Sequence, residues 1–114
     1  MEAVKQILRE QGTTAEDMEI GEHYEIEASG SMDLTIEKIG ENRLSVAHYY
    51  TQHGDIMSDP EIVFKIQDNE WTPVRYTQHP NIHQHSENGL PSVQEFAEQW
   101  SRNLKKQGFT NTNQ

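Results

Sequence analysis

Hydrophobic and polar residues alternate through most of the middle of the chain. Apolar side chains occupy every second position in five segments: 24–28, 32–36, 44–50, 61–67 and 71–77. Turn-forming residues separate these segments, at 29–31, 40–42, 54–60 and 68–70. Period-two alternation is typical of antiparallel strands with one buried and one solvated face. The pattern therefore predicts a meander of about five strands.

The two ends of the chain have helical spacing instead. Ala3, Val4, Ile7 and Leu8 recur on one face of a helix, and Gly12 predicts its end. The residues from Thr13 to Asp17 predict one further short helical turn, because a hydroxyl followed by acids satisfies free amides at a helix start.

A longer amphipathic helix is predicted near the C-terminus, with Ser92 and Glu95 as a capping box and Gly108 as its end. Its apolar stripe consists of Val93, Phe96, Ala97, Trp100 and Leu104. We expect this stripe to cover the apolar face of the sheet. The fold class is then α+β, a two-layer sandwich in one domain at residues 1–109, with a frayed tail at 110–114.

Two segments interrupt these patterns. Pro73 has no backbone N–H, so the segment 71–77, the last predicted strand, is expected at the sheet edge or to start irregularly. Residues 79–91 are polar and without period, which predicts a loop of about a dozen residues, a length often associated with function.

Charge narrows the classes of partner. The net charge of −10 disfavours direct binding to nucleic-acid phosphates. Six acids fall in the stretch 16–27 without a Lys or Arg: Glu16, Asp17, Glu19, Glu22, Glu25 and Glu27. They form either a solvated face or a surface for a basic protein partner.

The tetrapeptide Tyr-Thr-Gln-His occurs twice, at 50–53 and 76–79, each time where a predicted strand ends. If both strands flank the strand at 61–67, they run parallel and end at one side of the sheet, about 10 Å apart. That arrangement predicts a shared pocket there. The other interpretation is a chance repeat in a chain rich in Gln, Thr and His.

Each copy of the repeat ends in a histidine, and two more histidines follow the second copy. Histidine and carboxylate side chains are ligands for zinc and other divalent metals. The candidate metal ligands are His53, His79, His83 and His85, with Asp55 nearby. Their spacing matches no established ligand signature.

The stretch 50–61, followed by Phe64, Trp71, Pro73 and Tyr76, resembles a family of small uncharacterised bacterial domains often encoded on conjugative and other mobile DNA. The family pattern is Tyr-x-Gln-x-Gly-Asp-x-Met-x-Asp-Pro-Glu on a strand-turn-strand, and the match covers about residues 32–78. His53 stands where relatives commonly carry Asn. The resemblance implies no activity. It implies a shared feature formed by Tyr50, Gln52, Gly54, Asp55, Met57, Asp59 and Pro60.

We expect a binding or accessory module that acts through protein–protein contacts in mobile-element biology, without a cofactor. The sequence has no Cys, no Gly-x-Ser-x-Gly and no His-Glu-x-x-His, which disfavours the common enzyme classes. Two alternatives remain: a divalent-metal site with hydrolytic use, and a small-molecule pocket under the 79–91 loop. The expected binding residues are Tyr50, Gln52, Asp55, Asp59, Trp71 and Tyr76.

Neither a signal peptide nor a membrane span is expected, so a cytoplasmic location is predicted. An exposed edge strand would allow a homodimer.

Overall fold

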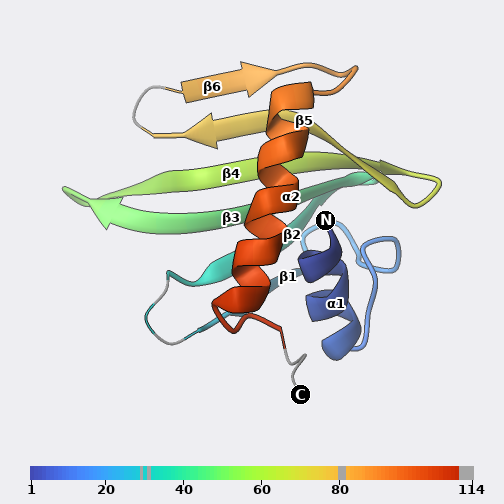
Figure 1. Cartoon of the computed structure of the whole chain (residues 1–114), viewed down its shortest axis with the longest axis horizontal. Helices are drawn as coiled ribbons and strands as arrows, with labels where there is room; N and C mark the ends of the chain where they lie inside the picture. The colour runs from blue at the N-terminus through green and yellow to red at the C-terminus, as the bar shows by residue number, and fades with distance from the viewer. Residues whose placement is uncertain (29, 31, 80–81, 111–114) are drawn as a thin grey trace.

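The computed structural model in Figure 1 describes residues 1–28, 30, 32–79 and 82–110. The helices are α1 (Glu2–Glu10) and α2 (Pro91–Lys106). The strands are β1 (His23–Ile26), β2 (Leu34–Gly40), β3 (Arg43–Gln52), β4 (Asp55–Gln67), β5 (Glu70–Gln78) and β6 (Ile82–His85). All six form one antiparallel sheet in chain order, which confirms the α+β meander with six strands rather than about five.

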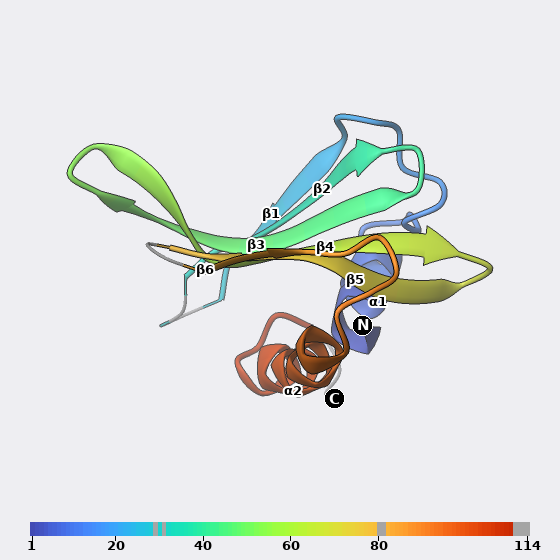
Figure 2. The same cartoon turned by 90° about the horizontal axis from the view of Figure 1, so that it is seen from above.

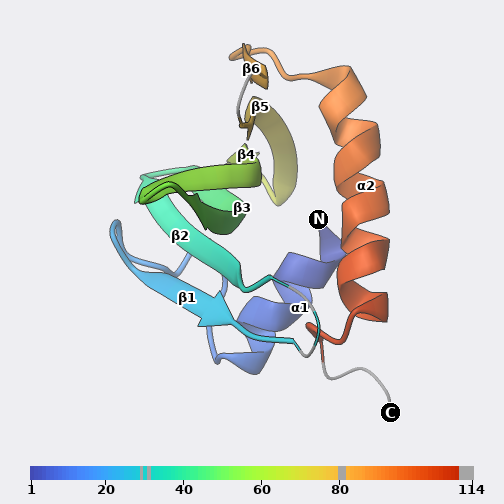
Figure 3. The same cartoon turned by 90° about the vertical axis from the view of Figure 1, so that its left-hand side faces the viewer.

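Both helices lie on the same face of the sheet (Figures 2 and 3), and α2 crosses the strands. Val93, Ala97, Trp100 and Leu104 are buried in the core as predicted, whereas Phe96 remains 36% exposed. The backbone N–H of Ala3 donates to Ser101 Oγ over 2.9 Å and joins α1 to α2. The core therefore lies between one sheet face and this pair of helices.

The sequence predicts a connection between strands at residues 54–60. The structure differs, because β4 already begins at Asp55. His53 and Gly54 both have positive φ, 54° and 85°, so these two residues alone turn the chain. Further along, Ala47 pairs with Glu61 and Tyr49 with Ser58, so Asp59 and Pro60 together oppose the single residue His48. This bulge accommodates a proline that has no N–H for the ladder.

The predicted loop at 79–91 contains the strand β6, which pairs with β5 from Arg75 to Gln78. Its four side chains are all exposed, and for this reason the sequence shows no alternation there. The segment 71–77 is consequently not the last strand. Pro73 still lies beyond the stretch that pairs with β6, beside a register shift in β4, in agreement with the predicted irregularity.

Two predicted caps differ from the structure. Leu90 is the N-cap of α2 and Pro91 follows it, with no side-chain cap, so Ser92 and Glu95 do not form a capping box. Thr14 Oγ1 accepts the N–H of Asp17 over 3.2 Å, but the residues form a turn rather than a helix.

The burial of Leu104 gives a test of the two-layer packing. Leu104→Ala should lower the free energy of unfolding by about 2–5 kcal/mol, because it opens a cavity between α2 and the sheet. Urea denaturation measures the change. Lys106→Ala on the exposed side of α2 is the control and should change stability by less than about 0.5 kcal/mol. Equal effects of both substitutions would contradict the packing of α2.

Candidate functional site

The sheet face opposite the helices is polar, and it is curved. Figure 2 shows β1 and β2 on one side and the tip of the β3–β4 hairpin on the other bending away from the helices. The pairing places one row of residues across this open face: Glu37, Ser45, Val63, Arg75 and His85. The neighbouring row is Thr35, Ala47, Glu61, Thr77 and His83. We call this surface the open face.

Glu61 is the centre of a polar cluster on the open face. Ser45 Oγ donates to Glu61 Oε2 over 2.6 Å, and Arg75 forms an ion pair with the same oxygen at 3.5 Å. Burial, and then the charge of Glu61, raise the pKa of the Tyr49 phenol above its ordinary value. Tyr49 therefore stays protonated near neutral pH and can donate a hydrogen bond.

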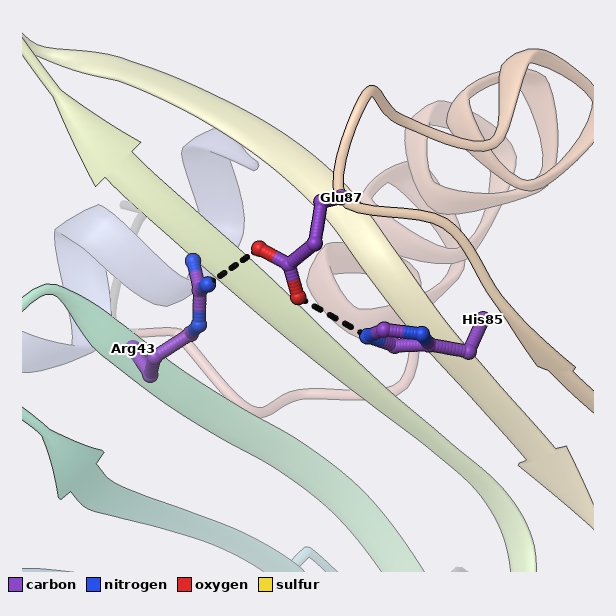
Figure 4. A network of polar contacts seen from close by, with 3 residues as sticks. All are labelled: Arg43, His85 and Glu87. Carbon is purple, nitrogen blue, oxygen red and sulfur yellow. Dashed lines mark hydrogen bonds and ion pairs between the residues drawn. The ribbon is translucent and has the colours of Figure 1, made fainter.

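A second polar cluster ties β3 to the segment after β6. Figure 4 shows Glu87 between Arg43 and His85, and it contacts both. The Nε2 of His85 lies 2.9 Å from Glu87 Oε2. The hydrogen bond from His85 and the charge of Arg43 hold the pKa of Glu87 below its ordinary value. The cluster therefore joins β3 to β6 and the segment after it, over the open face of β4 and β5.

The β3–β4 hairpin projects beyond its neighbours because β2 pairs with β3 only as far as His48. Between this hairpin arm and the ends of β1 and β2 lies a cleft of ≈ 380 Å³. Its lining residues are Glu25, Asp33, Thr35, Tyr49, Tyr50, Thr51 and Ile56. Ile56 is 72% exposed, more than the other large hydrophobic side chains in the described part of the chain. We call this hollow the arm cleft.

The two acids of the arm cleft lack a partner in the part of the chain that the structure describes. Within residues 1–28, 30, 32–79 and 82–110, the carboxylates of Glu25 and Asp33 have neither an ion-pair nor a hydrogen-bond partner. Two carboxylates without a partner among the described residues, in a cleft that two tyrosines also line, favour a cationic ligand, since tyrosine rings also attract cations.

The structure separates the predicted binding residues. Tyr50 lines the arm cleft. Tyr76 lies on the helix-covered face against Phe96, and its hydroxyl donates to Gln78, whose amide donates to Asp59 over 3.0 Å. Asp59 and Tyr76 are thus brought together through Gln78.

The remaining predicted binding residues lie elsewhere. Trp71 packs on Phe64 near the β4–β5 turn, at the opposite end of the sheet from the arm cleft. Asp55 is exposed beside the β3–β4 turn. The side chain of Gln52 lies outside the described part of the structure. The cavity under residues 88–91 is lined by none of Tyr50, Trp71 and Tyr76.

The two copies of the repeated tetrapeptide end on the same side of the sheet, as predicted, because β3 and β5 both run antiparallel to β4. The two copies nevertheless do not lie next to each other at that side of the sheet. The N–H of His79 donates to the carbonyl oxygen of Ser58, which pairs with Tyr49. His53 lies four residues after Tyr49, in the turn that follows β3. The two histidines are therefore offset by roughly 13 Å along the strands.

Of the four candidate metal ligands, two come together. The rings of His79 and His83 lie 5.6 Å apart between centroids. His79 Nδ1 also accepts the N–H of Ser58, and His85 is bonded to Glu87. Among the described residues, no group of three or more His, Asp or Glu side chains is placed to hold a metal ion. Metal binding stays a prediction.

The acidic stretch is exposed at five of its six carboxylates: Glu16, Asp17, Glu19, Glu25 and Glu27. Glu22 accepts hydrogen bonds from the Glu19 N–H and from the Tyr24 hydroxyl, which lower its pKa. The buried side chain of Lys38 donates to the carbonyl oxygens of Ala15 and Met18 and anchors the start of the stretch to β2. Of the six acids, only Glu25 lines the arm cleft.

Sequence reasoning missed several residues of the open face, among them Ser45, Tyr49 and Arg75. The signal was present in the alternation, because these residues occupy the polar positions between buried ones. Asp33 was missed in the same way. Its approach to Tyr49 and Ile56 depends on the projection of the hairpin arm, which no local pattern shows.

A six-stranded meander with both helices on one face and a cleft that contains two acids on the other defines an α+β protein with a one-sided core. The chain belongs to the family described as a domain of unknown function (DUF6908), whose model matches residues 2–110. The family motif and the mobile-element setting suggested by the sequence resemblance stay predictions.

No curated protein matches the chain, and no solved structure matches it. Within the residues that the structure describes, no helix has the length and apolar character needed to cross a membrane.

The lowered pKa of Glu87 predicts a pH-dependent contribution to stability. A carboxylate whose pKa is lowered on folding stabilises the protein above its unfolded pKa, and this contribution is lost as the pH falls through the folded pKa. Glu87→Gln should therefore lower the urea midpoint at about pH 7, and the difference from wild type should shrink as the pH approaches about 4. Glu95→Gln on the exposed side of α2 is the control. A pH-independent difference would contradict this role of Glu87.

Proposed function

We propose that this protein is a binding module whose arm cleft holds a basic segment of a partner protein. The observation that carries the proposal is the composition of the cleft. Two uncompensated carboxylates, Glu25 and Asp33, lie beside two tyrosines and the exposed Ile56. A Lys or Arg side chain satisfies the carboxylates, and an adjacent apolar side chain of the partner covers Ile56.

The charge of the whole chain supports the same class of partner. A net charge of −10 attracts a basic segment over several ångströms and accelerates the encounter. The exposed acids of the stretch 16–27 contribute to this attraction without contacting the ligand, apart from Glu25. Binding should therefore weaken as the salt concentration rises.

The polar cluster behind the cleft supports binding rather than turnover. Ser45 and Arg75 contact the Glu61 carboxylate, whose charge also helps to raise the pKa of the Tyr49 phenol, and Tyr49 lines the cleft. Because Ser45 and Arg75 already contact the Glu61 carboxylate, it is not free to act as a general base on a ligand in the cleft. The setting that we propose, the biology of conjugative and other mobile DNA, is supported by the sequence resemblance alone.

Selection of peptides from a random display library on the full chain tests the proposal. Peptides with Lys or Arg next to an aromatic or aliphatic residue should be enriched. The double variant Glu25→Lys with Asp33→Lys should lower the affinity for the selected peptide by about tenfold or more, because like charges then meet in the cleft. Ile56→Ser should weaken it separately. Fluorescence polarisation of the labelled peptide measures both effects.

The matched control is Glu16→Lys with Asp17→Lys, which changes the net charge equally outside the arm cleft. It should change the affinity by less than about threefold, through long-range attraction only. If the control weakens binding as much as the cleft variant, the acids act as a diffuse surface and the proposed site is wrong. Enrichment of peptides without basic residues would also overturn it.

A further inference from the structure

A second cavity lies at the other end of the sheet, where α1 meets the β4–β5 turn. Figure 1 shows α1 and this turn on the side away from the hairpin arm. The cavity has a volume of ≈ 180 Å³. A cavity of about 150 Å³ is known to hold one benzene ring, whereas pockets for drug-sized ligands start at about 300 Å³. This cavity therefore suits a ligand with a single ring.

The inner wall of the cavity is apolar. Leu8, Ala15 and Trp71 line it, and they are only 0%, 2% and 8% exposed. The indole of Trp71 offers an aromatic surface for a flat ring to pack against, at an offset or edge-to-face angle. Because these three residues belong to the core, the wall keeps its shape without a ligand.

The rim of the cavity is positively charged, in contrast to the chain as a whole. Lys5 and Arg9 lie on it against the single acid Glu16. Lys5 Nζ lies 5.7 Å from the centroid of the Trp71 ring, and an ion pair with Glu2 at 3.6 Å holds it only weakly, since Glu2 is exposed. Among the residues that the structure describes, the Arg9 guanidinium has no hydrogen-bond or ion-pair partner.

We infer that this cavity binds a small aromatic carboxylate, a single ring that carries one carboxylate group. The ring packs against the accessible edge of Trp71, with Leu8 and Ala15 behind it. The carboxylate lies at the rim, where Arg9 can donate two parallel hydrogen bonds and Lys5 adds a second positive charge. Glu16 disfavours a second anionic group on the ligand. This site is separate from the arm cleft and prefers the opposite charge, so it does not depend on the proposed function.

Benzoate and its neutral analogue benzamide are the probes for this site. The chain has two tryptophans, so the ¹⁵N–¹H spectrum of the full chain has two indole signals, and Trp100→Phe assigns the one from Trp71. Benzoate should shift the Trp71 signal saturably and leave the Trp100 signal in place, because Trp100 does not line the cavity. Benzamide should bind about tenfold more weakly, since it lacks the charge that Lys5 and Arg9 recognise.

Substitutions on the rim separate charge recognition from simple burial of a ring. Arg9→Gln and Lys5→Gln should each lower the affinity for benzoate by about fivefold. Glu16→Gln should raise this affinity by about twofold, because it removes a negative charge that repels the carboxylate. Lys106→Gln removes one positive charge from a residue that does not line the cavity and should have almost no effect on benzoate binding. The site is wrong if benzoate gives no saturable shift at about 20 mM, a concentration well above the Kd range expected of such small ligands. It is also wrong if benzamide binds as tightly as benzoate, or if Lys106→Gln weakens benzoate binding as much as Arg9→Gln does.

Discussion

The packing of α2 and α1 against the same sheet face is the constraint on which the rest of the structure depends. With a hydrophobic content of only 32%, the chain has enough apolar side chains for one core layer. Leu34, Ile36, Leu44, Val46, Ile62 and Phe64 supply the sheet side of that layer. The other face is left to polar side chains that must satisfy one another or water. The Glu61 and Glu87 clusters, and the arm cleft beside them, follow from this one-sided core.

The two candidate sites are at opposite ends of the sheet because each is formed where one part of the fold extends past its neighbour. At one end, the β3–β4 hairpin continues beyond β2 and encloses space next to Asp33. At the other end, α1 and the turn at 15–17 do not fill the space beside Trp71 completely. The acids at the first site and the cations at the second give the two spaces opposite preferences. A chain of one net sign can thus carry local sites of either charge.

The fold class, the two helices and most strands could be predicted from the sequence, because burial on one side imposes a period of two or 3.6. Residues 55–60 and 82–85 could not be predicted as parts of strands. In the first, Pro60 sits in a bulge that hides a continuing strand, and in the second every side chain is exposed, so no alternation exists. The site was predicted less well. Tyr50 and Glu25 were among the residues named from the sequence, for different reasons, and both line the arm cleft. Their proximity to Asp33 and Ile56 depends on strand lengths and register, which single residues do not encode.

The unequal lengths of the strands have one further consequence, for motion. From Tyr49 to Met57 the hairpin arm pairs mainly with itself and stands clear of both helices, whereas the rest of β3 and β4 lies in the middle of the sheet. Backbone amides in such a segment exchange their hydrogens with solvent through local opening, well before the whole domain unfolds. One wall of the arm cleft can therefore adjust to what it holds while Val46 and Ile62 stay packed.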